Sequence, residues 1–169
     1  AREFGTNNFP DCSNMCHEST SVGLPQSIGI GKGTVSLDDF DKTELVISIG
    51  HNPGTNHPRM MGTLHELARR GVPIIVFNPL KERALERFAD PQNVIEMATY
   101  GSTNIASTYF QVKAGGDAAA LKGIAKALLR LEAEQGDVLD RAFIDEHTLG
   151  FTEFAQDVDA TPWPDIERE

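Results

Sequence analysis

Three short stretches of this sequence carry groups that could do chemistry. The first is the adjacent pair Cys16-His17, in which a thiolate could bind a metal and an imidazole could accept a proton. The second and third are the glycine-containing turns at residues 50–57 and 113–117. Backbone N–H groups in such a turn, next to a helix N-terminus, favour phosphate. Together the stretches suggest a phosphate-rich ligand along the ends of strands, although each turn alone is also explained as an ordinary strand-to-helix connection.

The cysteine content gives little support to a zinc site or a structural disulfide. Cys12 and Cys16 are the only two cysteines in the chain. A disulfide between them would close a very short loop and stabilise the fold little. The spacing C-x3-C does not fit a zinc ribbon, and two ligands are too few for one. The simplest interpretation is two reduced thiols in an intracellular protein, and we expect a cytoplasmic location.

A strand–turn–helix–strand pattern positions the first glycine-containing turn. Residues 45–49 form an apolar run rich in β-branched side chains, which predicts a strand buried on both faces of a parallel sheet. From Met60 the apolar residues follow a helical period, Gly71 suits the helix end, and residues 72–77 predict a second buried strand. This is a βαβ unit. Ligands of such sheets bind at the carboxyl ends of the strands, so we expect the site in the turns after Ile49 and Phe77.

The remaining elements are predicted from shorter patterns. We expect a helix over residues 12–24 with Asp11 as its N-cap, a helical turn at 37–40, a helix at 81–88, and short strands at 93–97 and 108–112. The longest helix runs from Asp117 to about residue 136, and two short helices cover 140–147 and 151–158. The tail from residue 161 is assigned no element. We treat Met15, Met60 and Met61 as core residues, and His65 and His147 as helix-surface residues without a role.

Composition and charge limit the possible functions. The chain has 169 residues, of which 40% are hydrophobic, and this is enough for one domain with a real core. Its formal net charge of −10 argues against binding nucleic acid through a general basic surface. No apolar run approaches the length of a membrane span, so we expect no membrane partner. We divide the chain into an irregular or helical lead-in (1–43), a cofactor-binding core (44–136) and a helical extension (137–169).

Gly5-Thr6-Asn7-Asn8 is followed along the chain by Cys16-His17. This order resembles the bacterial molybdopterin formate dehydrogenases, and in particular formate dehydrogenase-like oxidoreductase alpha subunits. In that family a GTNN segment is followed at the same spacing by selenocysteine or cysteine and then histidine. The resemblance continues through Ser21-Val22-Gly23-Leu24, Gln26-Ser27-Ile28-Gly29, Gly50-His51-Asn52-Pro53, His57-Pro58, Asn78-Pro79 and Gly150-Phe151. It covers nearly the whole chain.

The resemblance implies a fold, a cofactor and a role for each matching residue. The fold would be a Rossmann-like α/β three-layer sandwich with a mainly parallel sheet. Cys16 would bind the molybdenum of a bis(molybdopterin guanine dinucleotide) cofactor, and a soft thiolate suits such a metal. His17 would accept the proton of formate, which is oxidised to CO2. Cofactor contacts would come from three turns, with Asn52 the best candidate for a direct hydrogen bond: Gly50, His51, Asn52, Pro53, Gly54 and His57; Asn78 and Pro79; and Gly116 and Asp117.

The sequence also departs from the family pattern. The turn at Asn78-Pro79-Leu80 usually reads Asp-Pro-Arg in the family, so an amide replaces the acid and a leucine replaces the arginine. Related enzymes are several times longer, and they carry a 4Fe-4S cluster and further domains that we expect outside these residues. We therefore interpret the chain as an internal domain of a larger enzyme, inactive alone, whose partners are formate, the remaining domains of its parent chain and an electron acceptor that the sequence does not identify.

Several alternatives stay open. Cys16 could be a buried structural thiol, and His17 an ordinary surface or core histidine. His51 and His57 are better explained as cofactor-loop or capping residues than as metal ligands, since zinc would need further ligands. The whole chain could instead be a non-redox nucleotide-binding α/β domain, a module that has lost the metal, or an enzyme of the same family acting on another small oxo-substrate.

Overall fold

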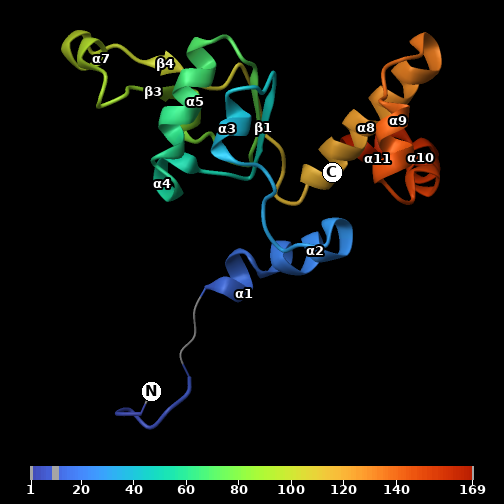
Figure 1. The fold of residues 1–169 in the computed structure, drawn as a ribbon, viewed down its shortest axis with the longest axis horizontal. Coiled ribbons are helices and arrows are strands. Elements are labelled where there is room, and N and C mark those ends of the chain that lie inside the picture. Colours follow the sequence, from blue (N-terminus) through green and yellow to red (C-terminus); the bar gives the residue numbers. More distant parts are fainter. Residues whose placement is uncertain (1, 9–11, 169) are drawn as a thin grey trace. The chain divides into compact units, whose positions relative to one another are not determined.

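The computed structural model describes residues 2–8 and 12–168 of the chain. These residues form two compact units, Ala1–Lys42 and Thr43–Glu169, which are coloured from blue to red along the sequence in Figure 1. The predicted N-cap Asp11 lies outside the described residues. No helix in the described part of the chain is both long and apolar enough to cross a membrane.

The first unit is helical. It contains α1 (Ser13–Cys16), α2 (Glu18–Ile28) and α3 (Leu37–Phe40), and α3 begins with a capping box in which Asp39 accepts a hydrogen bond from the Ser36 backbone. The helix expected over residues 12–24 is therefore interrupted at His17, whose φ of −129° departs from helical geometry. The prediction that Met15 belongs to a core was wrong, because its side chain is 97% exposed.

A three-stranded parallel sheet forms the centre of the second unit, and it confirms the predicted α/β fold class. Its strands are β1 (Val46–Ile49), β2 (Ile74–Phe77) and β5 (Thr108–Phe110), in the order β1-β2-β5. The register places Ile47, Ile75 and Thr108 in one row, and Ile49, Phe77 and Phe110 in the next row on the same face of the sheet. Two further strands, β3 (Arg87–Phe88) and β4 (Thr103–Asn104), pair antiparallel in a separate small sheet.

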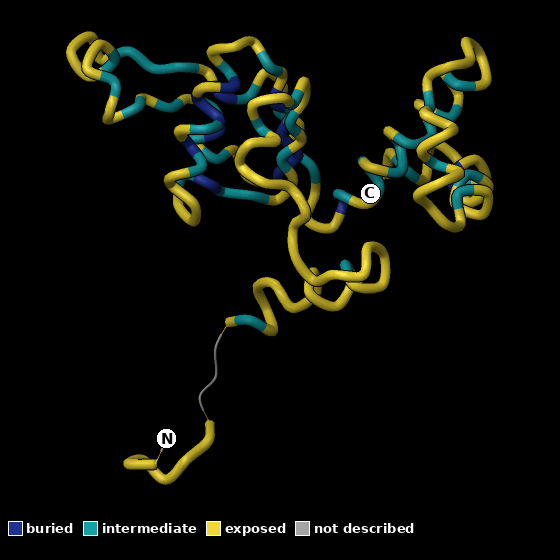
Figure 2. The backbone as a smooth tube through the Cα atoms, in the orientation of Figure 1, coloured by how far each residue is buried: buried dark blue, intermediate teal, exposed yellow. Residues whose placement is uncertain are grey.

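The predicted βαβ unit supplies the core. Helix α5 (Met60–Arg69) joins β1 to β2 and buries Met61, Leu64 and Leu67, which are 1% exposed. Ile74 and Val76 of β2 are fully buried and belong to the same core, drawn in dark blue in Figure 2. Gly71 follows the helix with a φ of +79°, a conformation that favours glycine, as its place at the helix end predicted.

The expectation that β1 is buried on both faces was wrong. β1 is an edge strand of the sheet, and its half-buried and exposed side chains alternate. Ile47, Ile49 and Phe110 belong to the rows on the other face from Ile74 and Val76, and they are 37–48% exposed. A continuous apolar run cannot by itself distinguish a central strand from an edge strand with one apolar exposed face.

Shorter elements follow the first two strands, and here the boundaries differ from those predicted. The structure has α4 (Pro53–Asn56) and α6 (Arg83–Glu86), so the helix expected at 81–88 is a single turn followed by β3. The strand expected at 93–97 is instead helix α7 (Val94–Thr99). Asn93 explains this difference, because its side chain caps the helix by accepting hydrogen bonds from Ile95 N and Glu96 N.

The C-terminal part of the second unit is helical. Helix α8 (Asp117–Gln135) is the longest, as predicted, and α9 (Arg141–His147) and α10 (Phe151–Ala160) match the two expected short helices. The tail, to which no element was assigned from the sequence, forms a further helix, α11 (Trp163–Arg168). Helices α10 and α11 pack on α8, where Lys122 pairs with Asp157 at 2.7 Å and Gly123 lies close to Ile166 and Trp163.

His65 has a structural role that the sequence analysis did not assign. It lies on α5 and is 4% exposed, so its placement on the helix surface was wrong. Its Nε2 lies 2.8 Å from Glu96 Oε1 and 3.0 Å from Thr103 Oγ1, and its ring meets the edge of Phe88. His65 therefore joins α5 to α7 and β4.

Replacing His65 with alanine is expected to lower the free energy of unfolding by about 1–3 kcal/mol, because Glu96 and Thr103 lose a buried partner. The matched control is His147→Ala, whose side chain is 52% exposed and for which we expect a change within about 0.5 kcal/mol. Chemical denaturation of the two variants measures the difference. Equal stability of both variants would contradict the structural role of His65.

Candidate functional site

The loops after β1 and β2 lie together at the carboxyl edge of the parallel sheet. Gly50 ends β1 with a φ of +61°, and its N–H donates to the carbonyl of Phe77 at 2.9 Å. One strand further on, the N–H of Asn78 donates to the carbonyl of Phe110 at 3.1 Å. The predicted cofactor residues at 50–57 and 78–79 therefore start from adjacent positions on one sheet edge, where open α/β sheets bind their ligands.

Asn52 is held by both ends of its side-chain amide. Its Oδ1 accepts a hydrogen bond from Thr55 N at 3.2 Å and so caps α4, while its Nδ2 donates to Glu82 Oε2 at 2.7 Å. An amide oxygen has two lone pairs and an amide nitrogen has two protons, so one acceptor and one donor position remain for a ligand. The arrangement fixes Asn52 between the two loops.

The backbones of the two loops also approach closely at Gly54. A Cβ at this position would lie 2.3 Å from the Cβ of Ala84 in α6, a distance that real Cβ atoms do not adopt. The neighbouring Pro53 is buried at the start of α4. The contact between α4 and α6 thus requires a glycine at position 54. This role could not be predicted from the sequence, because it depends on Ala84.

His51 and His57 face each other across the first loop. Nε2 of His51 lies 2.9 Å from Nδ1 of His57, and the ring centroids are 5.0 Å apart. Burial, and then the charge that His57 can carry, lower the pKa of His51. Within residues 2–8 and 12–168, no group of three or more His, Cys, Asp or Glu side chains could hold a metal ion. The lowered pKa favours a neutral His51 ring, which can hydrogen-bond with His57 in the loop.

The lowered pKa of His51 predicts a pH dependence of stability. The unfolded chain binds a proton at His51 below about pH 6.5, whereas the folded chain resists it. The stability that the neutral ring contributes is complete above that pH, and it is lost as the pH falls below it and through the lower pKa of the folded state. We expect His51→Asn to flatten the fall of the unfolding midpoint between pH 7.5 and 5, and His147→Asn to leave it as in the wild type. An unchanged pH profile in His51→Asn would contradict this assignment.

Tyr109 and Glu82 complete the sheet edge, although the sequence analysis did not select them. The hydroxyl of Tyr109 in β5 donates to Leu80 O at 2.7 Å and accepts from Glu82 N at 3.0 Å, and Asn78 Nδ2 lies 3.5 Å away. Gln111 Nε2 donates to Pro79 O at 2.7 Å. No local pattern marks these residues, because their partners are about 30 positions away in the sequence.

Gly116 and Asp117 lie at the N-terminus of α8, as predicted. Gly116 is buried and is the N-cap residue, while Asp117 is the first residue of the helix. Oδ1 of Asp117 is buried and has no hydrogen-bond partner among the residues that the structure describes. A carboxylate here competes with phosphate for the positive end of the helix, and it suits a ligand group that donates a hydrogen bond.

Cys16 and His17 belong to the first unit and are both exposed. Cys16 is the last residue of α1, and His17 stands between α1 and α2. Within this chain the Cys16 thiol is therefore exposed and is not part of a core. Cys12 is also a free, exposed cysteine, so the two thiols are not joined in a disulfide.

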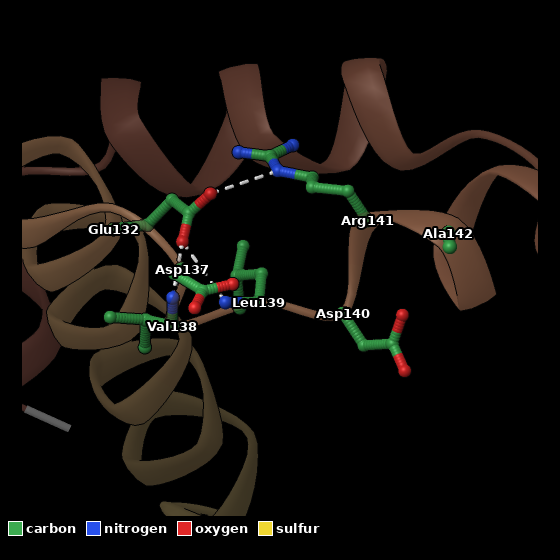
Figure 3. A pocket seen from close by; sticks show the side chains of 7 residues that line it. All are labelled: Glu132, Asp137, Val138, Leu139, Asp140, Arg141 and Ala142. Atoms are coloured by element: carbon green, nitrogen blue, oxygen red, sulfur yellow. Dashed lines mark hydrogen bonds and ion pairs between the residues drawn. The ribbon is translucent and has the colours of Figure 1, made fainter.

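A separate pocket of about 590 Å³ lies in the helical part, and none of the predicted site residues lines it. Figure 3 shows Glu132 and Arg141 pointing toward each other there, with Arg141 Nε 3.0 Å from Glu132 Oε1. Glu132 Oε2 also accepts from Val138 N and Leu139 N, and these backbone bonds, followed by Arg141, lower the pKa of the Glu132 carboxyl. The Glu132 carboxylate already has hydrogen-bond partners within the chain, so its role in this pocket is better explained as stabilising the turn between α8 and α9.

Comparison with known proteins relates the chain to oxidoreductases. Protein YdeP of Escherichia coli (strain K12) is 57% identical over 173 residues, which cover 99% of this chain and 23% of that protein. An uncharacterized oxidoreductase of Mycobacterium tuberculosis (strain ATCC 25618 / H37Rv) is 48% identical over 89% of this chain and 19% of that protein. No family model matches.

A more distant similarity concerns formate dehydrogenases. Formate dehydrogenase H of Escherichia coli (strain K12) is 29% identical over 92% of this chain and 18% of that protein. The chain thus spans less than a quarter of the length of the curated relatives that it matches. These similarities support a relationship to oxidoreductases and to formate dehydrogenases.

Proposed function

We propose that this chain is the molybdopterin-binding region of a formate dehydrogenase-like oxidoreductase, which oxidises formate to CO2 at a molybdenum bis(molybdopterin guanine dinucleotide) centre. The observation that carries the proposal is the similarity to formate dehydrogenase H over most of the chain. It is supported by the adjacent Cys16-His17 pair and by the two loops that share one edge of a parallel sheet.

The donor chemistry of Cys16 supports this proposal. Among the described residues, no group of three or more His, Cys, Asp or Glu side chains could hold a metal ion. Cys16 offers one exposed, unpaired sulfur, which suits a soft metal whose other ligands belong to the cofactor. We therefore assign Cys16 as the single protein ligand in this chain.

His17 is the proposed proton acceptor. Oxidation of formate to CO2 releases two electrons and one proton, and the bound cofactor would supply the two-electron acceptor. A ring nitrogen of His17 takes the proton, which is the usual task of an imidazole in general base catalysis. The adjacent position in the sequence keeps the imidazole near the proposed ligand, and its exposure leaves a path by which the proton reaches water.

The two loops bind the nucleotide part of the cofactor in this proposal. Gly50, Asn52 and His57 supply backbone and side-chain polar groups from the first loop, and Asn78 supplies an amide from the second. Asn78 replaces the acid that is usual in the family, and Leu80 replaces the arginine. An amide can still pair with the edge of a guanine, but the bond lacks the charge that strengthens a carboxylate contact. Gly116 and Asp117 are proposed to contact the cofactor from the start of α8.

The exposed apolar face of the sheet supports a role for further domains of the parent chain. Parallel sheets are almost always covered on both faces, yet Ile47, Ile49 and Phe110 are 37–48% exposed. We propose that a longer protein covers this face and supplies the 4Fe-4S cluster and the path to its electron acceptor. We also propose a cytoplasmic location for that protein.

Dye-coupled assays of the full-length protein test the substrate. We expect formate-dependent reduction of an artificial electron acceptor, and no comparable oxidation of a reduced dye by nitrate or a sulfoxide. Turnover with nitrate or a sulfoxide in place of formate would favour the alternative, an enzyme of the same family acting on another oxo-substrate. A protein that binds a nucleotide but contains no molybdenum, although it is purified from a host that synthesises the cofactor, would favour a non-redox nucleotide-binding domain.

A further inference from the structure

The hydroxyl of Tyr109 links β5 to the loop after β2 at the candidate site, and Glu82 extends this link to the loop after β1. Tyr109 lies in β5, and its hydroxyl donates to Leu80 O at 2.7 Å and accepts from Glu82 N at 3.0 Å in the loop after β2. Glu82 in turn accepts from Asn52 Nδ2 at 2.7 Å in the loop after β1. One hydroxyl therefore reaches the proposed ligand residue Asn52 through a single intermediate side chain.

The hydrogen bond to Tyr109 and the hydrogen bond to Asn52 fix two different parts of Glu82, its backbone and its side chain. The bond from Glu82 N to Tyr109 sets the backbone at the start of α6, because Glu82 is the N-cap residue of that helix. The carboxylate of Glu82 then orients the amide of Asn52, since a carboxylate can only accept and must face the Nδ2 side. This fixes which edge of the Asn52 amide donates and which accepts toward a ligand.

We propose that Tyr109 and Glu82 are positioning residues for the guanine nucleotide part of the cofactor. The inference rests on the proposed function of this sheet edge. Neither side chain is assigned to touch the ligand. The hydroxyl of Tyr109 fixes the loop after β2, and with it the backbone of Glu82. The carboxylate of Glu82 then fixes the orientation of the Asn52 amide, so that one N–H donor and one oxygen acceptor of Asn52 already face the ligand before it binds. The long contact between Asn78 Nδ2 and the Tyr109 hydroxyl at 3.5 Å places the second proposed guanine-binding amide beside the same group.

The chain offers a matched pair of substitutions, because it contains only two tyrosines. Tyr109→Phe removes the bracing hydroxyl and keeps the ring, whereas Tyr100→Phe makes the same change in a side chain that is 96% exposed. Glu82→Ala removes the acceptor for Asn52, and Glu82→Gln keeps an oxygen that can accept from it. Loss of one hydrogen bond of ordinary strength corresponds to roughly a tenfold change in binding.

The test measures GDP binding to the full-length protein purified without its cofactor, at a temperature where circular dichroism shows every variant folded. The wild type is expected to bind GDP more tightly than ADP. Tyr109→Phe and Glu82→Ala are expected to weaken GDP binding by about tenfold, Glu82→Gln by about threefold or less, and Tyr100→Phe not at all. Hydrogen exchange at Thr55 N, which donates to Asn52, is expected to become faster in the first two variants only.

Two results overturn the inference, and they are distinguishable. In the first result, the wild type binds GDP, and the variants Tyr109→Phe and Glu82→Ala bind it equally well. Tyr109 and Glu82 then have no positioning role, although the proposed function stands. If the folded wild type binds no GDP, the nucleotide role of this sheet edge fails and the inference fails with it. If Tyr109 and Glu82 only stabilised the fold, their substitution would lower the unfolding midpoint, but Glu82→Ala and Glu82→Gln would bind GDP with the same affinity.

Discussion

Replacing Cys16 with alanine in the full-length protein is expected to remove bound molybdenum and formate-dependent dye reduction together. Cys16 is the single protein ligand that we assign in this chain, and alanine has no donor atom. Loss of a supporting group around a metal already costs about 10–100-fold in affinity or activity, and loss of the ligand itself should exceed this range. Elemental analysis and the dye assay on the same preparation measure both effects.

Cys12 provides the matched control for this experiment. It is a free, exposed cysteine four residues earlier, and as the N-cap residue of α1 it makes no capping hydrogen bond through its side chain. Cys12→Ala is therefore expected to keep molybdenum and activity at the wild-type level. If Cys16→Ala and Cys12→Ala retained equal amounts of both, Cys16 would not be the ligand.

Replacing Gly54 with alanine should destabilise the candidate site severely. The added Cβ would lie 2.3 Å from the Cβ of Ala84, and the backbones of α4 and α6 would have to move apart. Overpacking of this kind costs about 1–3 kcal/mol in the free energy of unfolding. The same movement would stretch the 2.7 Å contact between Asn52 and Glu82, so cofactor retention should fall as well. Denaturation and the molybdenum content of the full-length variant report the two effects.

A compensating substitution identifies the cause. Ala84→Gly removes the atom that Gly54→Ala would strike, at a cost of about 0.5–1 kcal/mol for a glycine within a helix. The double variant Gly54→Ala/Ala84→Gly should therefore be about as stable as Ala84→Gly alone. Additive losses in the double variant would show that the contact between Gly54 and Ala84 is not the reason for the destabilisation.

Long periodic segments of the sequence predicted the fold well. The spacing of Met61, Leu64 and Leu67 defines one face of a helix, and these three residues are buried together. The strand after Gly71 and the helix that begins at Asp117 follow from equally clear patterns. Asn93 shows the limit of such patterns. A strand was expected at residues 93–97, whereas the structure has helix α7, which the Asn93 side chain caps.

The candidate site could be predicted only in part. The end of an apolar strand at Gly50 points to the loop that follows it, and the structure does place that loop beside the turn at Asn78. Glu82, Tyr109 and the close approach of Gly54 to Ala84 depend on contacts between residues about 30 positions apart. Such pairings are set by the tertiary fold, so local composition carries no signal for them. His65 is a similar case, because its partner Glu96 is 31 residues away.

The molybdenum and guanine content of the wild-type full-length protein, purified from a host that synthesises the cofactor, tests the proposed function most directly. We expect one molybdenum per polypeptide, together with two equivalents of GMP released by acid hydrolysis. A folded protein that contains neither would contradict the claim that this chain is part of a molybdopterin-dependent oxidoreductase.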